Sequence, residues 1–388
     1  MNEWTSIPLI DVIELVGGGT PKTSRHEYWD GNIPWLSVVD FNINRKFVFD
    51  TEKKITQKGL ENSSTNLLDI GDIIISARGT VGAMAVLAKP MTFNQSCYGI
   101  RGLKGKSITD YIYYLLSNTV AELKKISHGG VFDTITRDTF REILIALPPL
   151  QEQKAIASIL SSLDNKIDLL HRQNKTLEAM AKTLFRQWFI EEAREDWEDG
   201  TIADLVDFNP SRKLAKGSMA PYLEMAALST TTFNPDKWYD REFSSGTKFI
   251  NGDTLIARIT PCLENGKTAF ITFLEKDQVA WGSTEYIVMR PKAGLHHFFV
   301  YVLARNSDFR DYAEGCMEGS SGRQRVNVDH LKDYDIKIPP ESVIRDFNSF
   351  AESIVPKLHS NFLQIRTLEK LRDTLLPKLM SGEVRVAL

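Results

Sequence analysis

Apolar and small residues recur at alternating intervals of four and three along two long segments, and each segment follows a pair of prolines. This spacing is typical of the inner stripe of a coiled coil, so it predicts two long helices. Asn174 and Asn361 each occupy one position of a stripe. The first series contains Ile156, Leu160, Leu163, Ile167, Leu170, Leu177, Ala181, Leu184 and Trp188, and the second contains Phe347, Ala351, Ile354, Leu358, Ile365, Leu368, Leu375 and Leu379.

Each apolar stripe must be buried against a partner, and the simplest partner is the other helix. If Asn174 faces Asn361 in an antiparallel pair, the positions of one series meet those of the other, and Ile156 meets Leu379. The one imperfection is Arg372 of the second segment, which stands where an apolar residue would meet Leu163. A buried asparagine pair can fix the register of such helices. The alternative is that each helix packs only on its own domain. Pro356 predicts a kink or an early end in the second helix.

A mixed, glycine-rich part precedes each helix, and the two parts repeat one another. The segment "IGDIIISAR" (70–78) matches "NGDTLIAR" (251–258), and "RDTFREILIALPPL" (137–150) matches "VDHLKDYDIKIPPE" (328–341). A Gly-Asp turn before an apolar run predicts a strand in both copies. The segments "YIYYLLSN" and "FFVYVLARN" predict short buried helices, with strands as the alternative.

These patterns predict an α+β protein with two mixed α/β domains in a tandem repeat, separated by two long antiparallel coiled-coil helices with pseudo-two-fold symmetry. The predicted boundaries are residues 1–148 for the first domain, 149–192 for the first helix, 193–339 for the second domain and 340–388 for the second helix.

Composition narrows the class of protein. The chain has 388 residues and a formal net charge of −3, which argues against non-specific coating of nucleic acid but allows local basic loops. Its start lacks the pattern of a signal peptide, and no apolar run is long enough for a membrane span. The three cysteines lie far apart in the sequence. We therefore expect a cytoplasmic protein without a structural zinc site.

Loops of the first copy carry candidate contacts to nucleic acid. A run of three glycines precedes Lys22 and Arg25, and could bring the backbone close to a phosphate; a flexible turn is the alternative. Arg78 follows a predicted strand, from which it could reach guanine or phosphate; pairing with an acid of its own domain is the alternative. The candidates are Gly18, Gly19, Thr20, Lys22, Thr23, Arg25, Arg78, Gly79, Thr80, Asn94 and Gln95.

The second copy carries a more basic loop, "SSGRQRV" (320–326), whose counterpart in the first copy lies within "SHGGVFDTITRD" (127–138). A loop that changes its chemistry between two copies suits the reading of two different sequences; a solvated charged turn is the alternative. An arginine at the matched strand end and nearby hydroxyls add further candidates. The set is Arg258, Thr260, Ser283, Thr284, Ser321, Gly322, Arg323, Gln324 and Arg325.

Catalytic motifs are not found in the sequence. The Pro-Pro pairs stand in "LPPL" and "IPPE", which lack both the amide and the aromatic residue of the tetrad that holds a flipped base for amino methylation. "GLKGKS" (102–107) lacks the first glycine of a P-loop, and the seven histidines show no metal-binding spacing. The tryptophans Trp29, Trp35, Trp238 and Trp281 could stack on bases, but core packing is the simpler interpretation.

The helical segments, with "ALPPLQEQKAIASILSSLDNKIDLLHRQNKTLEAMAKTLF" and "LLPKLMSGEVRV", resemble the spacer helices of the specificity subunit of Type I restriction-modification systems. "VGGGTPKTSRHEYWDGNIPWLS" resembles the start of one group of that family's target recognition domains. "FNPSR", "ARITPCLENGK" and "SSGRQRVN" resemble elements of another group. The resemblance covers essentially the whole chain and adds Ser211, Arg212, Asn265 and Lys267 to the candidate DNA contacts.

This resemblance implies a non-catalytic protein without a cofactor of its own. Each target recognition domain would read one half of a bipartite, asymmetric site in double-stranded DNA. The helices would set the gap and dock two modification subunits, which carry S-adenosylmethionine and methylate adenine at N6. It leaves open whether two restriction subunits, which use ATP, join them. The second helix departs from the family pattern because Ser342-Val343-Ile344 replaces the "QEQ" of the first. An autonomous DNA methyltransferase or nuclease of unrecognised type is the alternative.

Overall fold

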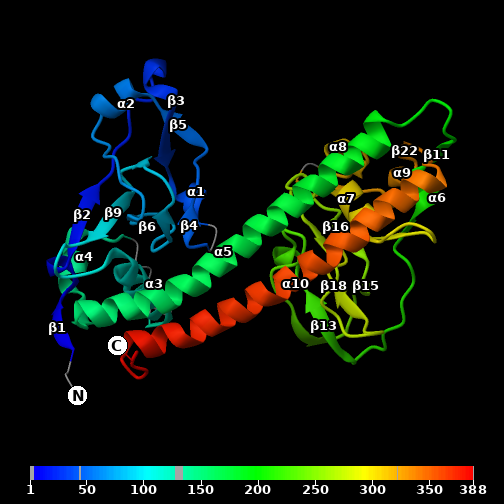
Figure 1. The fold of residues 1–388 in the computed structure, drawn as a ribbon. Helices are drawn as coiled ribbons and strands as arrows, with labels where there is room; N and C mark the ends of the chain where they lie inside the picture. The colour runs from blue at the N-terminus through cyan, green and yellow to red at the C-terminus, as the bar shows by residue number, and fades with distance from the viewer. Residues whose placement is uncertain (1–3, 43–44, 127–133, 321, 388) are drawn as a thin grey trace. The chain divides into compact units, whose positions relative to one another are not determined.

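The computed structural model describes residues 4–42, 45–126, 134–320 and 322–387, which form two compact units (Figure 1). The first unit comprises residues 1–169 and 365–388, and the second comprises residues 170–364. The two long helices, α5 (Leu150–Arg186) and α10 (Glu341–Met380), each contribute residues to both units. The described part of the chain contains no helix that is both long and apolar enough to cross a membrane.

The first unit is built around a five-stranded sheet in the order β2-β9-β6-β7-β4, beside a smaller sheet β5-β3-β8 and a ribbon of β1 and β10. The strands are β1 Thr5–Pro8, β2 Ile13–Gly17, β3 Trp29–Leu36, β4 Phe47–Val48, β5 Lys53–Ile55, β6 Ile73–Ser76, β7 Met84–Leu87, β8 Thr92–Phe93, β9 Cys97–Gly102 and β10 Leu144–Leu147. The helices are η1 Leu9–Asp11, η2 His26–Tyr28, α1 Val38–Phe41, α2 Gln57–Glu61, α3 Thr109–Ile126 and α4 Arg137–Glu142.

The second unit repeats this plan with a four-stranded sheet β12-β19-β16-β17, a second sheet β14-β13-β18-β15, and two ribbons, β11 with β22 and β20 with β21. Its strands are β11 Asp199–Thr201, β12 Val206–Phe208, β13 Met219–Leu223, β14 Tyr239–Glu242, β15 Thr247–Phe249, β16 Thr254–Ala257, β17 Thr268–Phe270, β18 Ala280–Gly282, β19 Tyr286–Pro291, β20 Met317–Glu318, β21 Arg325–Val326 and β22 Asp335–Lys337. Its helices are η3 Gln187–Glu191, α6 Ile202–Leu205, η4 Met225–Ala227, α7 Phe298–Ala304, α8 Ser307–Gly315 and α9 Val328–Leu331.

The repeated Gly-Asp turn starts the central strand of each unit, β6 and β16, as the sequence predicts. Gly71 and Gly252 adopt φ values of +87° and +84°, which glycine tolerates best. The following aspartate accepts a hydrogen bond from the backbone three residues earlier, at 2.9 Å for Asp72 and 2.8 Å for Asp253. Each carboxylate also pairs with an arginine of the neighbouring strand, Arg101 or Arg290 respectively. In both units the Gly-Asp turn therefore has a structural role: it joins the start of the central strand to the neighbouring strand.

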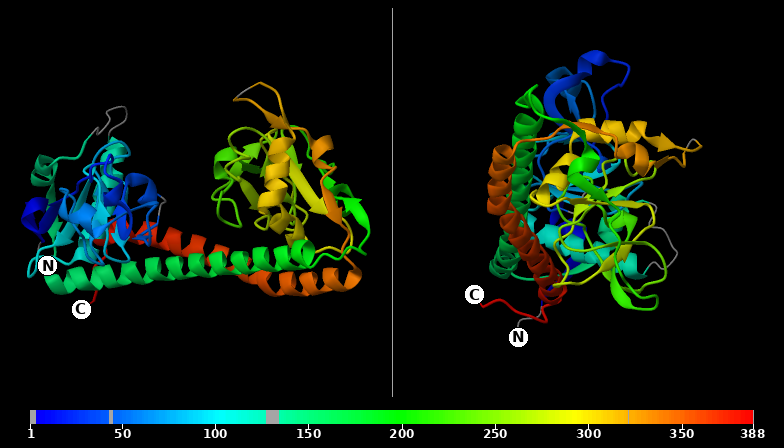
Figure 2. Two further views of the ribbon diagram at one scale, coloured as in Figure 1. Left: turned by 90° about the horizontal axis from the view of Figure 1, so that it is seen from above. Right: turned by 90° about the vertical axis from the view of Figure 1, so that its right-hand side faces the viewer.

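The two long helices pack against each other in antiparallel fashion within each unit, which confirms the predicted pairing (Figure 2). In the first unit, Ile156 and Leu379 share one buried cluster. Arg372, an apparent fault in the second stripe, donates to the buried Asp164 at 2.8 Å. The helices also bury a wider face than the stripe: Glu178 is 6% exposed and accepts a hydrogen bond from Tyr301 at 2.6 Å.

The helix α10 passes through Pro356 without interruption, so the predicted early end is wrong. Proline removes one backbone donor and leaves the carbonyl of Glu352, four residues earlier, without its helical partner. Pro356 and Glu352 both lie on the exposed side of the helix. Because water can satisfy that carbonyl, the helix tolerates the proline there.

Asn361 donates from Nδ2 to Oδ1 of Asn174 at 2.7 Å, which is the contact that the antiparallel register predicts. Asn361 is fully buried, whereas Asn174 is partly exposed. That the Asn174–Asn361 pair fixes the register of the helices stays a prediction.

Replacing Asn174 with leucine should destabilise the second unit by about 1–3 kcal/mol, because it removes the acceptor for the buried Nδ2 group of Asn361. Asn361→Leu should cost less, since Asn174 can reach water. The double variant should recover most of the loss, because no unpaired amide remains. Urea unfolding of all four proteins tests this order. Equal losses in the two single variants would contradict the proposed difference between a buried and an accessible partner.

Candidate nucleic-acid interface

Three candidate segments of the first unit meet at one end of its main sheet. Strand β9 pairs with the last residues of β2 and β6, where Tyr98 lies opposite Gly17 and Cys97 lies opposite Ser76. The segments 18–25, 78–80 and 94–96 therefore leave or enter the sheet at the same end. Backbone hydrogen bonds join them, from Gly19 to Phe93 at 2.9 Å and from Ala77 to Ser96 at 2.7 Å.

The glycine-rich loop of the first unit is tightly packed. A Cβ on Gly18 would collide with the carbonyl of Asn94, and a Cβ on Gly19 would collide with the backbone at residues 64–65. The buried indole of Trp35 donates to the carbonyl oxygen of Gly19 at 3.0 Å. Packing inside the unit thus explains why glycine is needed at these positions. Neither a flexible turn nor a close approach to phosphate is required to explain it.

The packed loop presents polar and basic side chains to solvent. Lys22, Thr23 and Arg25 are exposed, and Thr20 donates to Gln95 of the adjacent segment. Within the described chain, no side-chain partner is found for Arg78, which is exposed beside Gly79 and Thr80. Asn94 is half-buried, and its Oδ1 accepts a hydrogen bond from the backbone N–H of Ser96 at 3.0 Å. The first unit therefore offers basic and hydroxyl groups at one end of a rigid sheet.

The same end of the second unit's sheet gathers the equivalent segments. Ala257 ends β16 opposite Tyr286, the first residue of β19. Arg258 donates from its backbone to Glu285 at 2.9 Å, and Thr260 donates to Gln324 at 3.1 Å. The turn that holds Asn265 and Lys267 joins this end through a hydrogen bond from Ala257 to the Lys267 carbonyl at 3.1 Å. Segments far apart in sequence thus form one loop cluster.

Arg78 and Arg258 do not occupy equivalent positions, although the sequence match aligns them. The backbone of Ala77 donates to Ser96 and accepts from Ile135, whereas in the second unit Arg258 makes the corresponding bonds with Glu285 and Val326. Isolated bridges likewise join Arg78 to Thr134 and Ile259 to Arg325. Counted from the glycine of the Gly-Asp turn, Arg258 stands at the same place as Ala77, and Ile259 stands at the place of Arg78. Neighbouring residues of an extended segment point to opposite faces, so the two arginines are presented differently.

The carboxylate of Glu285 lies between two arginines of the second unit. Arg325 donates to it from Nε at 2.9 and 3.0 Å and from Nη2 at 2.8 Å, while Nε of Arg258 lies 4.0 Å away. Hydrogen bonds to Glu285 hold the pKa of the Arg325 guanidinium above its ordinary value. Two cations and one anion leave this cluster with a local excess of positive charge, despite the acidic chain.

The remaining candidates of the second unit vary in their placement. Gly322, Arg323 and Thr284 are exposed, and Gln324 and Ser283 are half-buried. Ser283 accepts the backbone N–H of Glu285 at 3.1 Å, and Lys267 donates to the carbonyl of Met225 at 2.9 Å. Ser321 lies outside the described residues.

Arg212 does not join the loop cluster. Its Nη2 atom lies 3.7 Å from Asp253, which precedes β16, whereas Arg258 follows the other end of that strand. Only 17% of the Arg212 side chain is exposed. This ion pair favours a structural role, and the neighbouring Ser211 is exposed.

Sequence reasoning missed Arg305, which organises the backbone behind the cluster. Its guanidinium donates five hydrogen bonds of 2.7–3.2 Å to carbonyl oxygens. Three of these oxygens belong to residues 229, 230 and 232, and two belong to Gly266 and Thr268. An arginine just beyond α7 carries no sequence signal for this role, because its partners are backbone atoms of distant segments.

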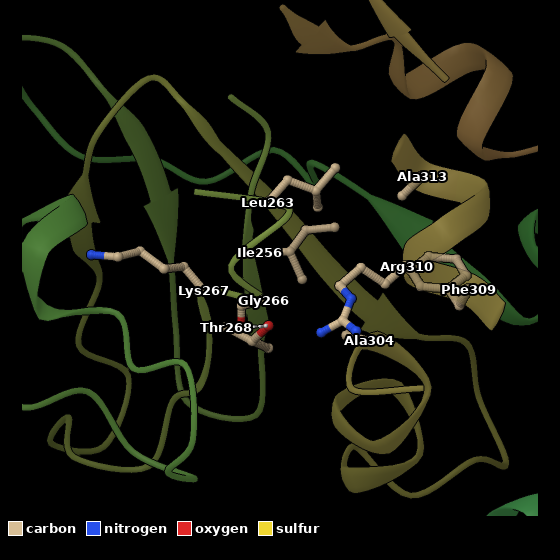
Figure 3. Close-up of a pocket in the computed structure, with 9 residues that line it drawn as sticks. All are labelled: Ile256, Leu263, Gly266, Lys267, Thr268, Ala304, Phe309, Arg310 and Ala313. Atoms are coloured by element: carbon tan, nitrogen blue, oxygen red, sulfur yellow. Dashed lines mark hydrogen bonds between the residues drawn. The ribbon is translucent and has the colours of Figure 1, made fainter. Parts of the chain in front are cut away.

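A small cavity lies behind the turn that holds Asn265 and Lys267, where Arg310 points toward Gly266 and Thr268 (Figure 3). Its volume of about 10 Å³ has room for about one water molecule, so it cannot accept a base. Among the described residues, no group of three or more His, Cys, Asp or Glu residues could hold a metal ion. Within the loop cluster of the second unit, the candidate groups for recognition are therefore the polar side chains of the loops.

Comparisons with known proteins bear on the family and the fold of the chain. A family model described as "Type I restriction modification DNA specificity domain" matches residues 1–179 and 194–346. The MjaIX specificity subunit of Methanocaldococcus jannaschii is 28% identical over 99% of this chain and 94% of its own length. The EcoR124I/EcoR124II specificity subunit of Escherichia coli is 28% identical over 42% of this chain and 41% of its own. A crystal structure of the S subunit from M. genitalium shares the fold, with a TM-score of 0.58 and 16% identity, covering 98% of this chain and 96% of that one.

Proposed function

Since the chain belongs to the family of Type I restriction-modification specificity subunits, we propose that each of its two units reads one half of a bipartite, asymmetric DNA site. One observation supports this proposal. Each unit has loops clustered at the equivalent end of its own main sheet, but the two clusters carry different side chains. The positions of Ser96 and Thr134 in the first unit correspond to Glu285 and Arg325 in the second. Different hydrogen-bond donors and acceptors at equivalent backbone positions should select different bases.

The long helices are the proposed docking surface for two modification subunits. Outside the buried stripe they expose apolar residues along both α5 and α10, and such residues suit a protein partner. The exposed set is Leu150, Ile159, Leu169 and Met180 on α5, and Leu363 and Leu371 on α10. The modification subunits would bring S-adenosylmethionine and the chemistry of adenine methylation. Two restriction subunits, which use ATP, would complete a nuclease where they are present.

This chain itself would be non-catalytic. We expect the purified chain alone to show no methylation or cleavage of DNA and no binding of S-adenosylmethionine in calorimetry. Mixed with its modification subunit, it should direct N6-adenine methylation to a single bipartite sequence with unequal halves. Sequencing of methylated bases in a plasmid library reads both halves and their gap, and the modification subunit alone is the control. Methylation by this chain alone, or a symmetric site, would overturn the proposal.

A further inference from the structure

The guanidinium of Arg325 offers two edges that can each make a pair of hydrogen bonds. One edge consists of Nε and Nη2, and the other consists of Nη1 and the second hydrogen of Nη2. Glu285 occupies the first edge, with donor–acceptor distances of 2.8–3.0 Å. Among the residues that the structure describes, the second edge faces only the carbonyl of Arg323, 3.5 Å from Nη1. This second edge has the spacing that fits O6 and N7 of guanine.

Backbone contacts fix both members of this pair. Arg325 belongs to β21 and lies opposite Glu318 of β20, and the next residue, Val326, donates to the carbonyl of Arg258 at 2.8 Å. Arg258 in turn donates to the carbonyl of Glu285 at 2.9 Å. The carboxylate and the guanidinium are thus held by three joined segments. Glu285 is 23% exposed and Arg325 is 44% exposed, so Arg325 remains accessible while its partner is largely covered.

We propose that Glu285 is a positioning residue that holds Arg325 for a bidentate contact with guanine in the half-site read by the second unit. The inference rests on the proposed function and adds to it the identity of one base. Glu285 and guanine use different edges of the guanidinium, so both can bind Arg325 at the same time. Fixing a long side chain in advance reduces the entropy that it loses on binding.

The charge of Glu285 also favours a base over the DNA backbone as the target of Arg325. The Arg325–Glu285 pair has no net charge, so Arg325 attracts a phosphate less than an unpaired arginine would, although Arg258 leaves the whole cluster with one positive charge. The edge of guanine carries no net charge, so its two hydrogen bonds do not depend on that attraction. The first unit holds Ser96 and Thr134 at the corresponding positions, so it lacks this pair. The contact should therefore affect one half-site only.

The experiment measures base preference with the complex of full-length chain and modification subunits. A library randomises the half-site of the second unit, and methylated products are sequenced. The variants are Arg325→Ala, Arg325→Lys, Glu285→Gln and, as the matched control, Glu318→Gln. Glu318 is an exposed acid opposite Arg325, but its carboxylate contacts Asn327 and His330, so its change alters the charge equally while the Glu285–Arg325 pair stays intact. The preferred half-site of the first unit reports correct folding and assembly in every variant.

Arg325→Ala should reduce the preference for guanine at one position by roughly 5- to 150-fold, as expected for a lost bidentate pair. Arg325→Lys should lose most of that preference, because an ammonium group cannot make the two parallel bonds. Glu285→Gln should weaken the preference at the same position, whereas Glu318→Gln should leave it intact.

Several outcomes would overturn the proposal. If Glu285→Gln keeps or strengthens the preference for guanine, Glu285 competes with DNA for the guanidinium of Arg325. Arg325→Ala that weakens binding evenly across all sequences, with a flatter salt dependence, means that Arg325 contacts phosphate. An unaltered complex that selects no bipartite site refutes the proposed function, which is seen before any variant is compared.

Discussion

Replacing residues 1–147 with the corresponding segment of a specificity subunit that has another target should change one half of the recognised sequence completely. The other half and the gap between them should stay the same. This result is expected because the loop cluster of the first unit lies wholly within the replaced segment, whereas the second unit and both long helices are retained. Sequencing of methylated sites for the chimera and its two parents measures both halves together.

The structure supports residue 147 as the point of exchange. Strands β1 and β10 pair from Thr5 with Leu147, so the segment begins and ends in one ribbon. The donor must preserve the contacts with α5, where Gln153 accepts from the backbone of Ile108 at 3.0 Å and Asp164 accepts from Tyr114 at 2.6 Å. Without them, buried polar groups of the helix would lack partners, and the chimera would be destabilised.

The reciprocal exchange serves as the control. Strands β11 and β22 pair from Asp199 with Lys337, so residues 199–337 form the matching segment of the second unit. This second chimera should change the other half of the site and leave the first half alone. A chimera of either kind in which both halves change would refute the model of two independent readers.

The fold could be predicted largely from local patterns in the sequence. The Gly-Asp turns, the central strands β6 and β16 and the buried helices α3 and α7 lie where the patterns place them, because each depends on a few adjacent residues. The pairing of α5 with α10 could also be predicted. Each helix has an apolar stripe with a single asparagine, and only one antiparallel register places the two asparagines opposite each other. The tolerance of Pro356 could not, because it depends on which side of the helix faces water.

The candidate site was less predictable, because its geometry depends on contacts between distant segments. Glu285 and Arg325 are 40 residues apart, and nothing in either segment indicates that they pair. The counterpart of Arg258 is Ala77: both stand at the same distance from the Gly-Asp turn, and their hydrogen bonds correspond. Arg212 was predicted as a DNA contact from its resemblance to a motif, but the structure pairs it with Asp253. The sequence indicates which loops carry suitable side chains, and the sheet determines which of them meet.

Inserting seven residues into each long helix should lengthen the preferred gap between the half-sites by about three base pairs. Seven helical residues add about 10 Å at 1.5 Å per residue, and DNA rises about 3.4 Å per base pair. The insertions belong between residues 169 and 170 and between residues 364 and 365, where the two units divide. Seven residues preserve the phase of the apolar stripe. The Asn174–Asn361 and Asp164–Arg372 contacts also stay intact, because each lies within one unit.

The rest of the design follows from the packing of the helices. An insertion near Phe185 is unsuitable, because this residue is buried against Phe299 and Phe347. Inserting five residues at the same two points is the matched control: it adds helix but turns the apolar stripe by about 140°, so it should abolish assembly or activity. The readout is methylation of a library of sites with varied gaps by the assembled complex. Three extra base pairs also rotate one half-site by about 100°, so the total rate should fall even at the best gap. If the longer helices keep the original gap and full activity, something other than α5 and α10 sets the spacing.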